Sequence, residues 1–475
     1  MLDRRWIALI ALCLGVVMIV LDGTVVTVAL PLIRADLGFT QASLVWIVNA
    51  YILTFGGCRL LGGRLGDLYG PRRVFLLGIV AFTLASLACG LARTQTEMIW
   101  ARAVQGAGGA VVNSTASCLV INMFIKSDER AKAVGVCGFI SSAGGTLGIF
   151  LGGFITASFD WHWVFLINIP FGVLVYALCL RLIPVTPAEH RTTGRLDLTG
   201  AATLTGALML AVYGIISGDD VGWFSSQSWL TLGGVLLLLA AFVFTESRVS
   251  NPLMPLSLIR SRMLVITNVT AALAAAAMFA TFFLTLYLQR VLGKNPLQVA
   301  LIFLPTCIIS AVLALGFSAR IVNRYGIKRP FAAGLLMAAL GLALLAGIPV
   351  QGDIWTDVIP GMTLFTVGAG VAGSPLFLSA VHGVAPEDSG LASGLIGTSS
   401  MVGGSLGLAI LAAAAEAWTR KLAALGTDPL VALIGGYHVA FSIGALLAVV
   451  AATLGVLWLP IKIQHSQPAP ASVQQ

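Results

Sequence analysis

Apolar stretches of about 20 residues, long enough to cross a bilayer as one helix, recur along the whole chain. From Val74 to Ala92, for example, there is no Asp, Glu, Lys, Arg or His. Only 10% of the 475 residues are charged and 58% are hydrophobic, whereas soluble domains are roughly 25% charged. The chain is therefore expected to be an all-α membrane protein with about fourteen transmembrane helices. The predicted spans are 7–30, 43–62, 74–92, 98–122, 133–158, 162–182, 198–217, 228–245, 264–289, 298–319, 330–350, 358–380, 391–415 and 436–460.

Basic residues gather in alternate connections between these spans. Arg72 and Arg73 follow the second span, and Lys328 and Arg329 precede the eleventh. Because Lys and Arg are retained on the cytoplasmic side of short loops, this pattern predicts a multi-pass protein of the plasma (inner) membrane with both termini in the cytoplasm. The net charge of +8 then follows from topology. No contiguous basic patch favours a nucleic-acid partner.

Two sequence patterns occur twice at nearly the same spacing. R-L-G-D-L-Y-G-P-R-R at Arg64–Arg73 is echoed by R-I-V-N-R-Y-G-I-K-R at Arg320–Arg329. S-S-A-G-G-T-L-G at Ser141–Gly148 is echoed by S-M-V-G-G-S-L-G at Ser400–Gly407. Such duplication is typical of transporters whose substrate site lies between two related halves. It predicts a six-helix bundle at 1–190, two extra helices at 191–250 and a second six-helix bundle at 251–475.

Asp22 lies in the middle of the first apolar span, which is expected to end at Pro31. A charge at that depth costs roughly 2.5 to 3.5 kcal/mol on insertion scales, so it indicates a proton or substrate site. Counting along the helices puts Asp22 roughly 12 Å and Arg102 roughly 9 Å below the outer helix ends. A nearby arginine favours the ionised carboxylate, whereas apolar burial favours the protonated one. We therefore predict a proton-coupling pair; a permanent structural salt bridge is the alternative.

The segment after the second span is predicted to form an inner latch. Its glycines allow a tight turn, and its acid can accept hydrogen bonds and pair with arginine. Ion pairs that form and break there would favour either the inward-open or the outward-open arrangement of the two halves. The alternative is that this segment is an ordinary turn whose arginines only mark the cytoplasmic side of the membrane. The predicted latch residues are Gly63, Asp67, Gly70, Arg72, Arg73 and, from the loop before the fifth span, Arg130.

Small residues and polar side chains in other spans complete the candidate sites. In the fifth span, Gly144, Gly148 and Gly152 have the spacing that lets helix backbones approach closely, which predicts a packing seam. Polar side chains at membrane depth that are candidates for lining a substrate cavity are Asn49, Gln105 and Asn113. Arg59 is expected near the inner end of its span, with its side chain extending toward the water.

Enzymatic signatures are weak. The G-A-G-V-A-G match at Gly368–Gly373 lies inside an apolar span with no preceding strand, which argues against dinucleotide binding. The five histidines are scattered without metal-ligand spacing, and the seven cysteines are predicted to be free packing thiols. The chain is expected to be no enzyme and to need neither metal, cofactor nor obligate protein partner, with the proton gradient as its energy source.

Four segments resemble motifs of the fourteen-span drug:proton antiporters of the major facilitator superfamily. They are L-D-G-T-V-V-T-V-A-L-P at Leu21–Pro31, Gly63–Arg73, R-A-V-Q-G-A-G-G at Arg102–Gly109 and W-H-W-V-F-L-I-N-I-P at Trp161–Pro170. The resemblance covers nearly the whole chain. It implies two six-helix bundles with two extra helices, and it places Asp22 at the position of the acid that the family ties to proton coupling.

The leading hypothesis is a proton-driven exporter of small lipophilic drugs or antibiotics. Ile149 follows Gly148 where the family's antiporters usually carry proline. This departure keeps open a proton-coupled exporter or importer of one specific metabolite. A membrane receptor or scaffold without transport is a third hypothesis, which the repeat and the charges within the spans argue against.

Overall fold

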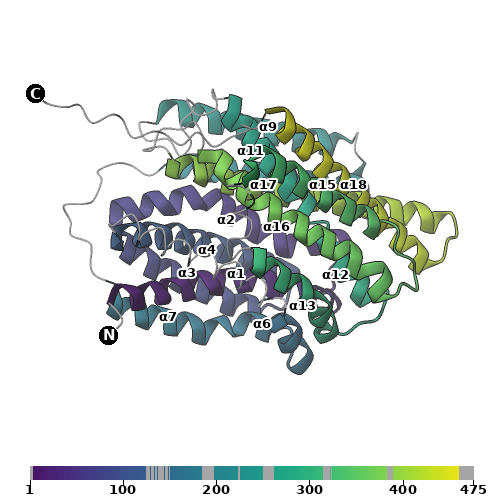
Figure 1. The fold of residues 1–475 in the computed structure, drawn as a ribbon, viewed down its shortest axis with the longest axis horizontal. Helices are drawn as coiled ribbons and strands as arrows, with labels where there is room; N and C mark the ends of the chain where they lie inside the picture. The colour runs from purple at the N-terminus through teal and green to yellow at the C-terminus, as the bar shows by residue number, and fades with distance from the viewer. Residues whose placement is uncertain are drawn as a thin grey trace, which may run out of the picture.

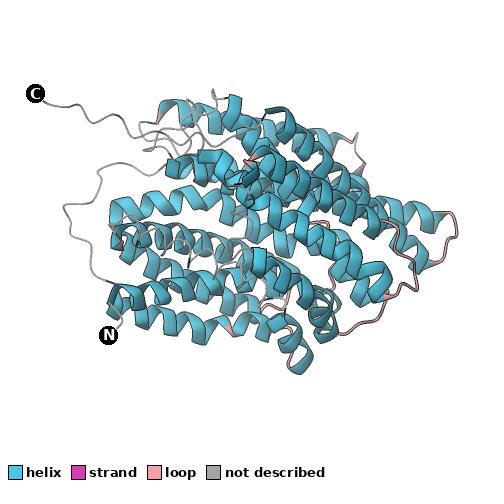
Figure 2. Ribbon diagram, in the orientation of Figure 1, coloured by secondary structure: helices cyan, strands magenta, loops and turns pink. Residues whose placement is uncertain are grey.

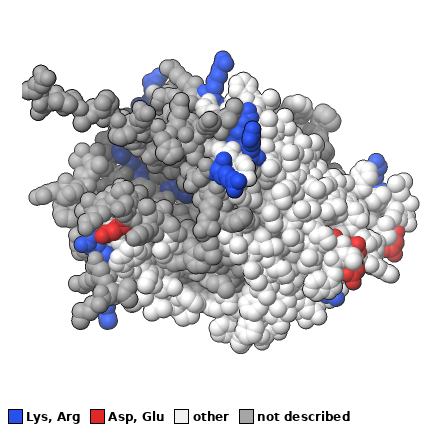
Figure 3. Space-filling model, viewed as in Figure 1, with Lys and Arg blue, Asp and Glu red and all other residues white. Residues whose placement is uncertain are grey.

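The computed structural model describes residues 4–124, 150–183, 197–222, 225–249, 262–313, 324–381 and 389–458, with single positions at 129, 133, 136, 144, 148 and 321. These residues form helices and short connections without a strand among them (Figure 2). Ten helices within the described part are long and apolar enough to cross a membrane. Figure 3 shows a broad uncharged band on one face of the molecule, with acidic side chains beyond it at one end. The all-α membrane fold is thereby confirmed.

Helices of the first half pack mainly on one another (Figure 1). The pairs α2 with α4, α3 with α4 and α1 with α7 form most of its interior. Its elements are α1 (Arg4–Leu37), α2 (Gln41–Tyr69), α3 (Pro71–Gly90), α4 (Gln95–Met123), α6 (Trp163–Leu166) and α7 (Asn168–Leu182).

Helices of the second half form another such group, in which α15 packs on α16 and α18, and α11 on α17. Its elements are α11 (Arg262–Met278), α12 (Thr281–Arg290), α13 (Pro296–Val312), α15 (Lys328–Leu345), the short π-helix η3 (Ile354–Val358), α16 (Ile359–Val381), α17 (Ser389–Ala424) and α18 (Pro429–Trp458). The two groups are called the N-bundle and the C-bundle below.

Two further helices, α8 (Leu198–Val221) and α9 (Ser226–Arg248), lie between the bundles in the sequence. α8 packs against α2 of the N-bundle, α17 of the C-bundle and α9. A small apolar cluster joins these elements, with Leu53 of α2, Leu208 of α8 and Ala409 of α17 at its centre. α8 therefore covers the seam between α2 and α17, whereas only 6% of the apolar span in α9 is buried.

Several helix boundaries differ from those predicted. α1 continues past Pro31 to Leu37, because a proline within a membrane helix removes a single backbone hydrogen bond that the surroundings can replace. α2 continues to Tyr69 and therefore includes Gly63 and Asp67, which were expected in a loop. The chain then turns at Gly70, whose φ of 91° suits glycine.

Three of the described contacts between the bundles lie in the half of the molecule away from the start of α1, which is the predicted cytoplasmic end. The Gln289 amide of α12 donates to the Val28 carbonyl of α1 at 3.0 Å. The Ser405 hydroxyl of α17 donates to the Asn49 side chain of α2 at 2.9 Å. A Cβ on Gly153 would lie 2.5 Å from the Pro296 carbonyl at the start of α13. These contacts join the bundles in the half of the molecule opposite the predicted cytoplasmic end.

Candidate functional site

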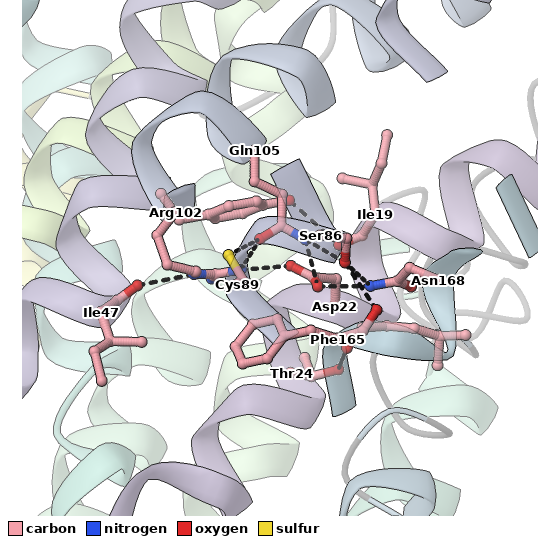
Figure 4. Close-up of polar contacts among 12 residues, drawn as sticks. Ile19, Asp22, Thr24, Ile47, Ser86, Cys89, Arg102, Gln105, Phe165 and Asn168 are labelled. Carbon is pink, nitrogen blue, oxygen red and sulfur yellow. Dashed lines mark hydrogen bonds and ion pairs between the residues drawn. The ribbon is translucent and has the colours of Figure 1, made fainter. Parts of the chain in front are cut away.

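Asp22 and Arg102 form an ion pair in the interior of the N-bundle (Figure 4). The Arg102 Nη1 atom donates to Asp22 Oδ2 at 2.6 Å, and each residue is only 1% exposed. The structure thus brings together the two charges that the sequence placed at similar depth. Removing such a pair from water has an unfavourable desolvation free energy, which is offset only when the geometry is good and further hydrogen bonds form.

Neutral side chains from α3, α4 and α7 complete this geometry (Figure 4). Asp22 Oδ1 accepts hydrogen bonds from the amides of Gln105 and Asn168, both at 2.8 Å. The same two amides also donate to the Ser86 hydroxyl, at 3.0 Å and 2.9 Å. All are at most 4% exposed. The carboxylate therefore meets three donors from α4 and α7, an arrangement suited to its ionised form.

Arg102 has acceptors besides Asp22. Its Nε donates to the Ile47 carbonyl of α2 at 3.0 Å, and its Nη1 also donates to Gln105 Oε1 at 2.7 Å. Its guanidinium carbon lies 4.2 Å from the centre of the Tyr51 ring, within cation–π range. The arginine is thus held by α2 and α4 together. Because the whole pair is enclosed, exchange of a proton with water requires a rearrangement of these helices.

The predicted glycine seam lies against the stretch of α1 that carries Asp22. A Cβ on Gly148 would lie 3.1 Å from the Leu21 carbonyl and would collide with the Thr24 hydroxyl. A Cβ on Gly152 would lie 2.8 Å from the Val25 carbonyl, whereas one on Gly144 would make ordinary contact with Val20. Glycine at positions 148 and 152 therefore allows the fifth span to approach the backbone of α1 beside the acid.

The predicted latch is described in part. Gly63 and Asp67 lie in the last turns of α2, and Gly70 makes the turn into α3. The Arg72 guanidinium donates to the Leu180 carbonyl near the end of α7 at 2.5 Å. Arg73 is exposed. The Asp67 side chain and Arg130 lie outside the described residues, so the ion pairing of the latch stays a prediction.

The candidate cavity residues lie in three different environments. Gln105 belongs to the Asp22 network. Asn49 is buried where α2 meets α17, and its Nδ2 atom has no described partner. Asn113 is partly exposed on α4. Among the described residues, no three His, Cys, Asp or Glu side chains are placed to bind a metal ion.

Ser86 and Asn168 were not identified from the sequence. Both are neutral polar residues within apolar helices, where such side chains are common and most often bond to a nearby backbone carbonyl. Asn168 does stand in the segment Trp161–Pro170 that resembles a family motif, and this position was the available signal.

A helical membrane bundle with an enclosed carboxylate–arginine pair has the construction of a secondary transporter.

Comparison with known proteins agrees with this class. The chain matches the Major Facilitator Superfamily over residues 12–408. It is 36% identical over 456 residues to the puromycin resistance protein pur8 of Streptomyces alboniger, covering 94% of this chain and 90% of that protein. It is 37% identical over 406 residues to the cephamycin export protein CmcT of Amycolatopsis lactamdurans, covering 85% and 84%. The protein belongs to the Major Facilitator Superfamily.

A solved structure shows the same fold. A bacterial homologue of the human lysosomal transporter Spinster, in an inward-facing and unoccupied conformation, aligns with a TM-score of 0.68. The alignment covers 96% of this chain and 97% of the other at 16% sequence identity. At that identity the likeness concerns the fold alone.

Proposed function

We propose that the protein exports small lipophilic drugs or antibiotics across the plasma membrane in exchange for protons. The observation that carries the proposal is the enclosed Asp22–Arg102 pair, a titratable group at membrane depth held by four helices. Two similar proteins are named for puromycin resistance and cephamycin export, which supports export of antibiotic-like molecules. The proton gradient supplies the energy, and both termini lie in the cytoplasm. No cofactor or obligate protein partner takes part.

The hydrogen bonds around Asp22 suit a group that gains and loses a proton. When Asp22 is protonated, its attraction for Arg102 falls, but Arg102 keeps the Ile47 carbonyl, the Gln105 oxygen and the Tyr51 ring. The amides of Gln105 and Asn168 keep the Ser86 hydroxyl as an acceptor. Protonation therefore weakens the link between α1 and α4, while each of these nitrogen atoms keeps at least one acceptor.

Rocking of the two bundles then couples this change to substrate movement. The helices of 1–190 act as one bundle and those of 251–475 as the other, with 191–250 beside their seam and the substrate between them. The contacts at Val28 and Asn49 stabilise the arrangement that is closed at the outer end. Gly63, Asp67, Gly70, Arg72, Arg73 and Arg130 form the latch that stabilises the opposite arrangement.

Everted membrane vesicles containing the full chain test the proposal. Asp22→Asn is expected to abolish substrate accumulation driven by a pH gradient, because the amide cannot carry the proton. It should retain exchange of labelled for unlabelled substrate without a gradient, which a merely unfolded protein would lose. Asp160→Asn removes an exposed carboxylate and is the matched control. Undiminished pH-driven accumulation by Asp22→Asn would refute the coupling role.

A further inference from the structure

Arg59 is a second arginine at membrane depth, and it lies outside the Asp22 network. Because α2 continues to Tyr69, Arg59 stands ten residues, or about 15 Å, before the helix end instead of near it. Its guanidinium carbon lies 2.9 Å from the position that a Cβ on Gly397 of α17 would occupy. The side chain therefore lies against α17 of the C-bundle and is partly exposed, and Arg59 is deeper in its helix than the sequence predicts.

The Arg59 guanidinium has no anionic partner among the residues whose side chains the structure describes. No ion pair or hydrogen bond joins it to them, whereas Arg102 has a carboxylate, an amide oxygen and a carbonyl. Charges in such surroundings are normally paired or coordinate a ligand, because an unpaired one costs several kcal/mol. Arg59 thus provides a positive charge at the junction of the bundles that an anionic ligand would neutralise.

Polar residues of both bundles stand at the depth of this charge. On the N-bundle side, the Ser114 hydroxyl of α4 donates to the Arg59 carbonyl at 2.6 Å, which places the adjacent, partly exposed Asn113 at the same depth. On the C-bundle side, Thr398 follows Gly397, and its buried hydroxyl has no described partner. An amide and a hydroxyl are groups that can hydrogen-bond the oxygens of an acid that Arg59 leaves free.

Glycine at position 397 is what allows this arrangement. A Cβ there would collide with the Nη1 atom of Arg59, so any other residue would displace the guanidinium. Asp22, by contrast, is fully occupied by three donors and is unavailable to a cationic substrate. Among the described residues, the charge at this junction without an ionic partner is therefore positive.

We infer that Arg59 binds the acid group of amphipathic organic monoanions, such as lipophilic carboxylates or sulfonates, and so determines a preference for them. A guanidinium suits such groups because its planar donors match their oxygens. A ligand held between Arg59 and α17 contacts both bundles and therefore favours the arrangement in which they are joined there. This inference rests on the export function proposed above and names its substrate class.

Two fluorescent probes with one skeleton test the inference: anilinonaphthalene sulfonate, an anion, and phenylnaphthylamine, which lacks the sulfonate and is neutral. Equilibrium binding of both to the purified full chain is measured by fluorescence, and pH-driven transport by everted vesicles. The native chain should bind the anion more tightly. Arg59→Gln should weaken anion binding about 10- to 100-fold, the effect expected for losing a hydrogen bond to a charged group, and leave the neutral probe unchanged.

Two further variants make the result specific. Arg59→Lys keeps the charge and should retain part of the preference, whereas Arg93→Gln removes an exposed arginine and should change neither probe. Equal binding of both probes by the native chain, or an equal effect of Arg59→Gln on both, overturns the inference. If neither probe is transported under a pH gradient while the anion still binds in an Arg59-dependent way, the export function is contradicted. The anion site remains supported by that result.

Discussion

At the scale of single residues, Asp22 and Arg102 depend on each other. Each is 1% exposed, so removing either partner leaves a buried charge uncompensated. Such a loss typically costs about 3 to 5 kcal/mol, while removing both charges together costs much less. Asp22→Asn and Arg102→Gln should therefore each lower the thermal unfolding temperature strongly, and the double variant should recover much of the loss.

The double variant also separates stability from coupling. Unfolding in detergent measures the first, and pH-driven transport in vesicles measures the second. Recovered stability without recovered transport is the expected result, since no proton carrier remains. If the two destabilisations simply add, the residues do not act as a pair, because additivity is the behaviour of independent sites.

The sequence predicted the charged half of this site and not the neutral half. Asp22 and Arg102 stand out because charged side chains are rare in apolar spans, and helix geometry placed them at similar depth. Ser86 and Asn168 carry no such signal, since a hydroxyl or amide in a membrane helix can bond to its own backbone. Their role depends on how α3 and α7 are rotated, which the sequence does not specify.

At the scale of elements, α2 and α4 approach closely through one of two adjacent glycines. A Cβ on Gly62 would lie 2.9 Å from the Cα atom of Val111, a backbone atom that cannot move aside. A Cβ on Gly63 would have no described atom within 4 Å. Gly62→Ala should therefore destabilise the protein by about 1 to 3 kcal/mol through overpacking. Gly63→Ala should be neutral or stabilising by up to about 1 kcal/mol, because alanine favours the helix.

These two variants form a matched pair within one helix, and thermal unfolding of both measures the difference. Equal destabilisation by the two would show that α2 and α4 are farther apart, or rotated differently, than described. The sequence could not distinguish the two positions, since both follow Leu61 in an unbroken glycine pair. Helix ends were also predicted too early, at Pro31 and near Gly62, because proline and charged residues end soluble helices more reliably than membrane ones.

At the scale of the whole molecule, few polar contacts hold the bundles together at the end opposite the predicted cytoplasmic side. The Gln289–Val28 and Ser405–Asn49 hydrogen bonds join different pairs of helices. Each such bond contributes about 0.5 to 1.5 kcal/mol net. A transporter that alternates between two arrangements needs them to be close in free energy, and polar contacts this weak can form and break at a gate at little cost.

The Gln289 hydrogen bond should therefore influence which arrangement predominates. Gln289→Leu removes a contact available only when this end is closed, and a loss of about 1 kcal/mol shifts the populations roughly fivefold toward the open form. Spin labels at the exposed loop positions Arg93 and Gln351, one in each bundle near this end, should then report a larger share of long distances. Gln227→Leu breaks a comparable bond to Tyr213 within the α8–α9 pair and should leave the distances unchanged. An unaltered distribution in Gln289→Leu would mean that the apolar contacts alone keep this end closed.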